Sequence, residues 1–242
     1  MNEINGTLLK KELLVRNPLR LLGKDGDERL PKGSFGAVVA RAGVGKTALM
    51  VQMALCTLLK GKNVLHISLT DPVQKVSLWY EEVFRNMSSD FDSGHMARIW
   101  EEILIHRFIM TFQADQFSVP KLTERLTDLT EQGIFYPQVA LVDGLNGEEV
   151  SREFMEQFKD LAKEMGLRVW FALRSHRHET PELSQVPASM AAIGDLFETV
   201  IGMQPEGQRT QVRLLKGEGH DQSVSVLVLD PATMLIQDTT AA

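Results

Sequence analysis

The hydrophobic pattern of this chain alternates between two periods. Short apolar runs, several with adjacent β-branched residues, are typical of buried strands and occur at residues 34–40, 64–69, 105–112, 139–142 and 167–173. Apolar residues recur at helical spacing over 47–60, 73–86, 96–104, 119–132 and 152–165. Strands that alternate with helices through short connections predict an α/β fold, with a mostly parallel sheet flanked by helices on both faces.

The pattern changes toward both ends of the chain. From Thr199 onward, turns separate short strands at 199–203, 210–215, 223–229 and 234–237, which predicts an edge of antiparallel or mixed strands. Residues 1–29 are mostly polar, with a short apolar stretch broken by Pro18, and we expect an N-terminal arm that ends in a turn. Because domains average about 150 residues, the remaining residues 30–242 are expected to form one α/β domain.

The composition excludes several classes of function. Lys and Arg number 26 against 32 Asp and Glu, so the net charge of −6 provides no overall attraction to nucleic acid. The single cysteine, Cys56, forms no internal disulfide and no multi-thiolate zinc site, and we expect a reducing, cytoplasmic environment. No apolar run approaches the roughly 18 residues of a membrane span, and no signal peptide is predicted.

A phosphate-binding pattern lies between the first predicted strand and the first predicted helix of the domain. Residues 40–47 read ARAGVGKT, which matches the P-loop pattern except that alanine replaces its first glycine. Glycines let the backbone curl around a phosphate, lysine adds a positive charge, and threonine offers a hydroxyl to Mg²⁺. A chance glycine turn is the alternative, but the strand–loop–helix context favours nucleotide binding. The predicted binding residues are Ala42, Gly43, Val44, Gly45, Lys46, Thr47 and Ala48.

A carboxylate ends another buried strand. The apolar run at 139–142 is followed by Asp143, and a strand often ends in aspartate simply because aspartate favours turns. Together with the loop around Lys46, however, Asp143 fits the acidic partner that holds Mg²⁺ in phosphoryl-transfer sites. We therefore predict that Thr47 and Asp143 hold Mg²⁺, and that Lys46 and Asp143 are catalytic.

The order of these motifs resembles the RecA superfamily, and most closely the KaiC-like ATPases, over about residues 30–236. Three segments carry the resemblance besides the loop: the lead-in Leu30-Pro31-Lys32-Gly33, the strand 64–72 with its acidic end, and the segment 213–220 with Lys216, Gly217 and His220. The resemblance implies a P-loop NTPase that takes ATP and Mg²⁺, and a homo-oligomer in the form of a ring or a filament.

The resemblance also implies a general base at the end of the strand 64–69, which follows the predicted helix 47–60. This chain has Thr70-Asp71 there, where the family usually has glutamate, and Asp71 is one methylene shorter. A carboxylate at this place orients or deprotonates the attacking water. The alternative is that Asp71 and Pro72 simply begin the next helix.

Two further groups are implied to sense or stabilise the γ-phosphate. Ser175 or Arg174, after the strand 167–173, matches the polar strand end of the family, and the basic segment 174–178 is otherwise a solvated surface loop. Lys216, with Arg213 or Arg209 behind it, is implied to reach a neighbouring subunit's nucleotide; its alternative is an exposed basic residue on a hairpin.

These features leave three functions in order of preference. The first is an ATPase whose nucleotide state controls self-assembly or binding to a protein partner, and the second is a regulatory module that holds ATP or ADP without hydrolysing it. A DNA recombinase comes last, because the loop 144–151 contains Glu148 and Glu149 and no basic residue. Nucleic acid and membrane are not expected partners.

The histidines and tryptophans are assigned structural roles. His66 and His106 lie in predicted strands and are expected to be hydrogen-bonded core or edge residues rather than metal ligands. The three tryptophans are expected to be anchors in the core or at an interface.

Overall fold

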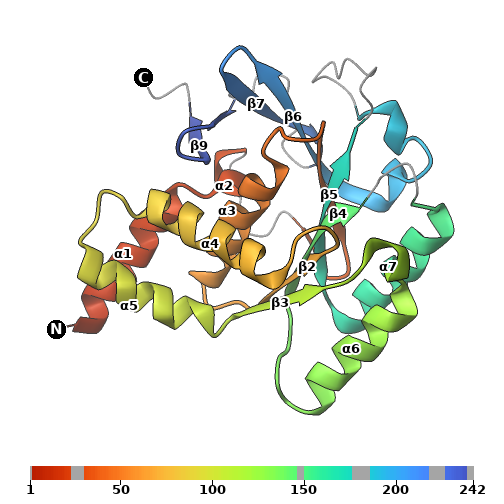
Figure 1. Ribbon diagram of the computed structural model, residues 1–242, viewed down its shortest axis with the longest axis horizontal. Coiled ribbons are helices and arrows are strands. Elements are labelled where there is room, and N and C mark those ends of the chain that lie inside the picture. Colours follow the sequence, from red (N-terminus) through yellow and green to blue (C-terminus); the bar gives the residue numbers. More distant parts are fainter. Residues whose placement is uncertain (1, 23–29, 146–149, 176–185, 218–226, 239–242) are drawn as a thin grey trace.

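A computed structural model describes residues 2–22, 30–145, 150–175, 186–217 and 227–238. Within them, nine strands form one sheet in the order β3-β2-β4-β5-β1-β6-β7-β8-β9 (Figure 1). The strands are β1 Phe35–Ala40, β2 Val64–Ser68, β3 Arg107–Thr111, β4 Val139–Leu145, β5 Arg168–Arg174, β6 Phe197–Glu206, β7 Arg209–Lys216, β8 Leu227–Asp230 and β9 Leu235–Asp238. The helices are α1 Asn2–Val15, α2 Pro18–Leu21, α3 Lys46–Leu58, α4 Val73–Met87, α5 Ser93–Leu104, α6 Val119–Glu131 and α7 Arg152–Met165.

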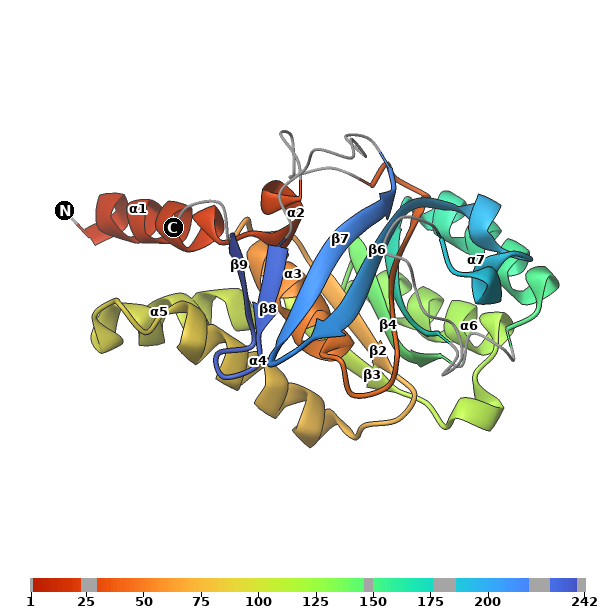
Figure 2. The same ribbon diagram turned by 90° about the horizontal axis from the view of Figure 1, so that it is seen from above.

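The predicted α/β fold class is confirmed at the level of its layers. Helices α1 to α5 gather on one face of the sheet, and α6 and α7 cover the other (Figure 2). Strand β1 is buried along its whole length, because a parallel strand between two helical layers has no solvated side. Each face therefore has its own apolar core, and the sheet separates the two.

The register of the parallel strands brings distant residues to one edge. Strands β1 to β6 run parallel, and β5 lies between β1 and β4. Ala40 pairs with Arg174, and Ser68 pairs with Asp143, so the carboxyl ends of four strands lie at the same edge. In open parallel sheets this edge is where ligands bind.

The C-terminal strands agree with the predicted mixed edge. Strand β6 continues the parallel part beside β1, whereas β7, β8 and β9 each run antiparallel to the strand before. Of the predicted strand 223–229, residues 227–229 lie in β8 and residues 223–226 lie outside the described residues.

The N-terminal segment contains structure that the sequence pattern did not predict. Residues expected to form an arm and a turn fold into α1 and the short α2, which the Asn17 side chain caps by accepting a hydrogen bond from Leu19 N. Leu13 and Leu22 are buried against the α3 side of the sheet, and Lys10 pairs with Glu102 of α5 at 2.7 Å. Residues 23–29, where the turn was expected, lie outside the described residues.

None of the helices within the described residues is long and apolar enough to cross a bilayer.

His66 is a buried histidine, as predicted. It lies in β2, fully buried, and its Nδ1 shares a hydrogen bond of 3.1 Å with the Tyr80 hydroxyl of α4. Burial and, to a smaller extent, the nearby Arg107 lower the pKa of His66 to about 4, while Asp71 acts in the opposite direction. His66 is therefore neutral in the folded protein at neutral pH, and its Nε2 has no hydrogen-bond partner.

We expect acid to destabilise the fold through His66. An unfolded histidine takes up a proton near pH 6.5, whereas the folded one does so near 4, so stability present above pH 6.5 is lost as the pH falls toward 4. The loss is about 3 kcal/mol at about 1.4 kcal/mol per pKa unit. His66→Gln should flatten this part of the pH profile in urea unfolding experiments between pH 7.5 and 4. An unchanged profile would show that His66 contributes nothing to the acid sensitivity.

Candidate functional site

The connection between β1 and α3, residues 40–47, is referred to below as the glycine loop. Gly43 and Gly45 have φ of +77° and +103°, in the left-handed region that favours glycine, as the sequence predicted. A Cβ on Gly43 would meet nothing within 4 Å, so only the backbone conformation calls for glycine there. At Gly45 a Cβ would lie 2.5 Å from Leu229 Cδ2, so a side chain there would also force the Leu229 side chain to move.

Lys46, the first residue of α3, folds back over the glycine loop. Its Nζ donates hydrogen bonds to the carbonyl oxygens of Ala40 at 3.0 Å and Arg41 at 2.9 Å. Burial lowers the pKa of Lys46, and Arg174 lowers it further, while Asp143 opposes both. The side chain thus concentrates positive charge where the loop meets the helix N-terminus, whose dipole attracts anions.

Thr47 and Asp143 come together, as predicted. Thr47 Oγ1 donates to Asp143 Oδ2 at 2.6 Å, a contact between residues 96 positions apart. Burial raises the pKa of Asp143, and the Thr47 hydrogen bond and the Lys46 charge counteract part of that rise. A hydroxyl and a carboxylate are the hard oxygen donors that Mg²⁺ prefers, so this pair fits that ion. Among the described residues, no three His, Cys, Asp or Glu side chains gather into a metal site.

A cavity of about 470 Å³ opens beside these groups at the carboxyl edge of the sheet. This volume lies within the range of about 300–1,000 Å³ that is typical of small-molecule sites. It is lined by Ala42, Gly43, Gly45, Lys46, Thr47, Ala48, Thr70, Trp79, Asp143, Gly144, Leu145, Ala172 and Arg174. Of the predicted binding residues in the loop, Val44 does not line the cavity and packs instead against the apolar core.

The wall of the cavity at the end of β2 is formed by Thr70 rather than Asp71. The Asp71 carboxylate pairs with Lys75 Nζ at 2.9 Å, one turn along α4, and does not line the cavity. Asp71 N also donates to Ser68 Oγ at 3.0 Å, which fixes the entry into the helix. Asp71 thus lies just before Pro72, the N-cap of α4, although it is close enough to Asp143 to influence the pKa of Asp143.

Trp79 is a lining residue that the sequence pattern did not identify. It projects from the second turn of α4 and forms the cavity wall together with Thr70. Its position on α4 marked it only as an anchor, and it is also half-buried against the core. No feature of the sequence alone indicates that its indole faces the cavity.

At the end of β5, Arg174 lines the cavity and Ser175 does not. Ser175 N donates to Ala40 O at 3.1 Å, which joins β5 to the start of the glycine loop. The Ser175 hydroxyl is buried and has no hydrogen-bond partner. Of the two predicted γ-phosphate groups, the geometry thus brings Arg174 to the cavity; residues 176–178 of the basic segment lie outside the described residues.

Lys216 does not line the cavity of its own chain. It pairs with Val200, which is level with Ala37 near the amino end of β1, and its Nζ donates to Gly194 O at 2.9 Å. Lys216 therefore has no place in the site of its own chain and was predicted to act on a neighbouring one. His220 lies outside the described residues.

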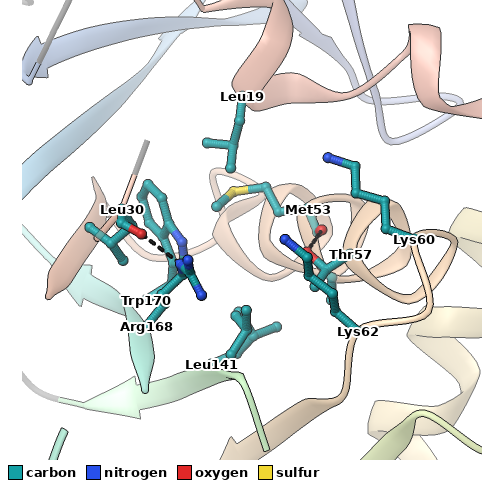
Figure 3. Close-up of a pocket in the computed structure, with 11 residues that line it drawn as sticks. Leu19, Leu30, Met53, Thr57, Lys60, Lys62, Leu141, Arg168 and Trp170 are labelled. Carbon is teal, nitrogen blue, oxygen red and sulfur yellow. Dashed lines mark hydrogen bonds between the residues drawn. The ribbon is translucent and has the colours of Figure 1, made fainter. Parts of the chain in front are cut away.

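A second cavity lies at the amino ends of β4 and β5, between α2 and the end of α3 (Figure 3). Its volume is about 40 Å³, far below the roughly 300 Å³ at which small-molecule sites begin. Arg168 closes one side by donating to Leu30 O at 2.7 Å. This cavity is too small for a nucleotide, so the carboxyl edge remains the candidate site.

No protein-family model and no curated protein matches this chain. The resemblance to RecA-like ATPases therefore rests on the motifs of the sequence alone.

We expect two substitutions of Asp143 to separate its charge from its hydrogen bond. Asp143→Asn keeps an acceptor for Thr47 Oγ1 and removes a charge that is costly to bury, so the unfolding free energy of the ligand-free protein should not fall. Asp143→Ala leaves the Thr47 hydroxyl without its acceptor and should cost about 1–3 kcal/mol. Urea unfolding at pH 7.5 measures both. Equal losses in the two variants would contradict this account of the pair.

Proposed function

We propose that this protein binds Mg²⁺-ATP at the glycine loop and hydrolyses it, as an ATPase of the RecA/KaiC type. One observation carries the proposal: the hydrogen bond of 2.6 Å between Thr47 and Asp143, immediately beside Lys46. The glycine loop, from which we predict triphosphate binding, and Asp143, from which we predict Mg²⁺ binding, thus lie side by side. The cavity beside them has the size of a small-molecule site, and its polar groups have the matching chemistry.

The residues of the site would divide the work of binding and charge stabilisation. The backbone N–H groups of the glycine loop and of the start of α3 would donate hydrogen bonds to the phosphate oxygens, and Lys46 would exchange its two carbonyl partners for these oxygens. Thr47 and Asp143 would hold Mg²⁺, which when bound neutralises charge on the β- and γ-phosphates. Arg174 would add positive charge on the side of β5.

A second candidate function is a module that holds ATP or ADP without efficient hydrolysis. The wall at Thr70 and Trp79 favours it, because this part of the cavity presents a hydroxyl and an indole but no carboxylate. Asp71, the carboxylate that follows Thr70 in the chain, is engaged with Lys75. Hydrolysis through Asp71 would require this exposed pair to open, which is cheap because such pairs contribute about 0.3–0.5 kcal/mol.

In either case we propose that nucleotide state controls self-assembly into a homo-oligomer or binding of a protein partner. Lys216 would contribute positive charge to a neighbouring subunit's nucleotide, because it does not line the cavity of its own chain. Such a contribution would make turnover rise with protein concentration.

Lys46→Ala tests nucleotide binding directly. A charge-assisted contact to phosphate is worth about 1.5–3 kcal/mol, so the affinity for Mg²⁺-ADP in titration calorimetry should fall more than about tenfold. Lys121→Ala removes an exposed lysine on α6 and should leave the affinity unchanged. Absence of any heat of binding with the unaltered protein, across millimolar nucleotide, would overturn the proposed function.

Asp71→Asn distinguishes the two candidate functions. If Asp71 is the general base, phosphate release should fall about 10²-fold or more, while the affinity for ATP stays the same. Lys75→Ala is the matched control, because it breaks the same ion pair but keeps the carboxylate, and it should not slow turnover. An unaltered protein that binds ATP without releasing phosphate at any protein concentration would establish the non-hydrolysing module instead.

A further inference from the structure

The C-terminal strands contact the glycine loop directly. Leu229 of β8 is buried, and its Cδ2 lies 2.5 Å from the point where a side chain at Gly45 would place its Cβ. Met203 Cε lies next to the same point, at 3.8 Å. Gly45 is the left-handed residue that precedes α3, so a methyl group from β8 packs on the residue that turns the loop into the helix.

Strands β8 and β9 form a C-terminal hairpin, residues 227–238, which contacts α3 at a second point. Gln52 is fully buried in α3, and its Oε1 accepts a hydrogen bond of 3.1 Å from Ile236 N of β9. Its Nε2 donates to Arg16 O at 3.0 Å, in the segment between α1 and α2. Figure 2 shows β8 and β9 alongside α3. Helix α3 thus contacts the hairpin at the start of the helix and again two turns further along the helix.

A third contact joins the hairpin to the other helix beside the cavity. Asn86 Nδ2 of α4 donates to Thr233 O at 2.7 Å, in the turn between β8 and β9. That turn contains Met234 at a φ of 59°, an uncommon conformation for a residue other than glycine. Helix α3 supplies Lys46 and Thr47 to the cavity, and α4 supplies Trp79, so one hairpin contacts both helices that carry the site.

We propose that Leu229 is a positioning residue for the glycine loop, and that the hairpin 227–238 keeps the loop in its binding conformation. The effect of Leu229 on nucleotide affinity rests on the proposed function, whereas its effect on the conformation of the glycine loop does not. If the Leu229 methyl is removed, the backbone at Gly45 gains access to other conformations, because a glycine has no side chain of its own to restrict φ and ψ. Affinity then falls in proportion to the fraction of molecules whose loop is competent to bind.

The test compares Leu229→Ala with Leu227→Ala. Leu227 lies on the same strand, belongs to the same apolar core and is also buried, but none of the three atoms nearest to a Cβ at Gly45 belongs to it. Leu229→Met is the conservative variant that refills the space. Two quantities are measured for each: hydrogen exchange of the amides at 42–48 in the nucleotide-free protein, and the affinity for Mg²⁺-ADP by calorimetry.

Leu229→Ala should speed exchange of the loop amides and weaken Mg²⁺-ADP binding about tenfold. Leu227→Ala should lower thermal stability to a similar extent but leave both quantities unchanged, and Leu229→Met should restore them. Loop exchange that is equal in the two alanine variants, or unaltered in Leu229→Ala, would overturn the positioning role. If loop exchange responds selectively to Leu229→Ala but no variant binds nucleotide, the positioning role stands and the proposed function fails.

Discussion

The candidate site depends on the register of four neighbouring parallel strands. Ser68 pairs with Asp143, and Ala40 pairs with Arg174, so strands β2, β4, β5 and β1 all end at the same edge. A shift of one residue in any of them would turn its side chains to the other face. Burial of apolar side chains on both faces of the sheet fixes this register, and the polar groups of the site are therefore placed by the packing of two apolar cores.

The opposite charges of Lys46 and Asp143 offset part of the cost of burying each of them. Burial disfavours the charged forms of both Lys46 and Asp143, and each of the two stabilises the charge of the other. Two carbonyl oxygens and one hydroxyl complete their hydrogen bonds. An incoming anion with a divalent cation can replace these internal contacts group by group, because it offers oxygen atoms to Lys46 and a positive centre to Asp143.

The sequence was informative where function depends on local backbone chemistry. Gly43 and Gly45 were predictable because only glycine adopts their conformation easily. Thr47 was predictable because it follows the lysine of the loop motif at the start of a helix, and Asp143 because it follows an apolar run typical of a buried strand. The roles of Thr70, Trp79 and Leu229 were not predictable, since they arise from contacts between elements far apart in the chain. The helices α1 and α2 were missed because Pro18 and the polar residues obscured a short pattern of buried leucines.

The buried amide of Gln52 has a consequence for sequence variation in related chains. Its oxygen faces a backbone N–H and its nitrogen faces a backbone carbonyl, in a place from which water is excluded. Glutamate would set a second acceptor against the carbonyl, and leucine or methionine would leave two backbone groups without partners. Position 52 therefore favours a side chain of this length that both donates and accepts a hydrogen bond, which makes glutamine the residue to look for there in any homologue that keeps this architecture.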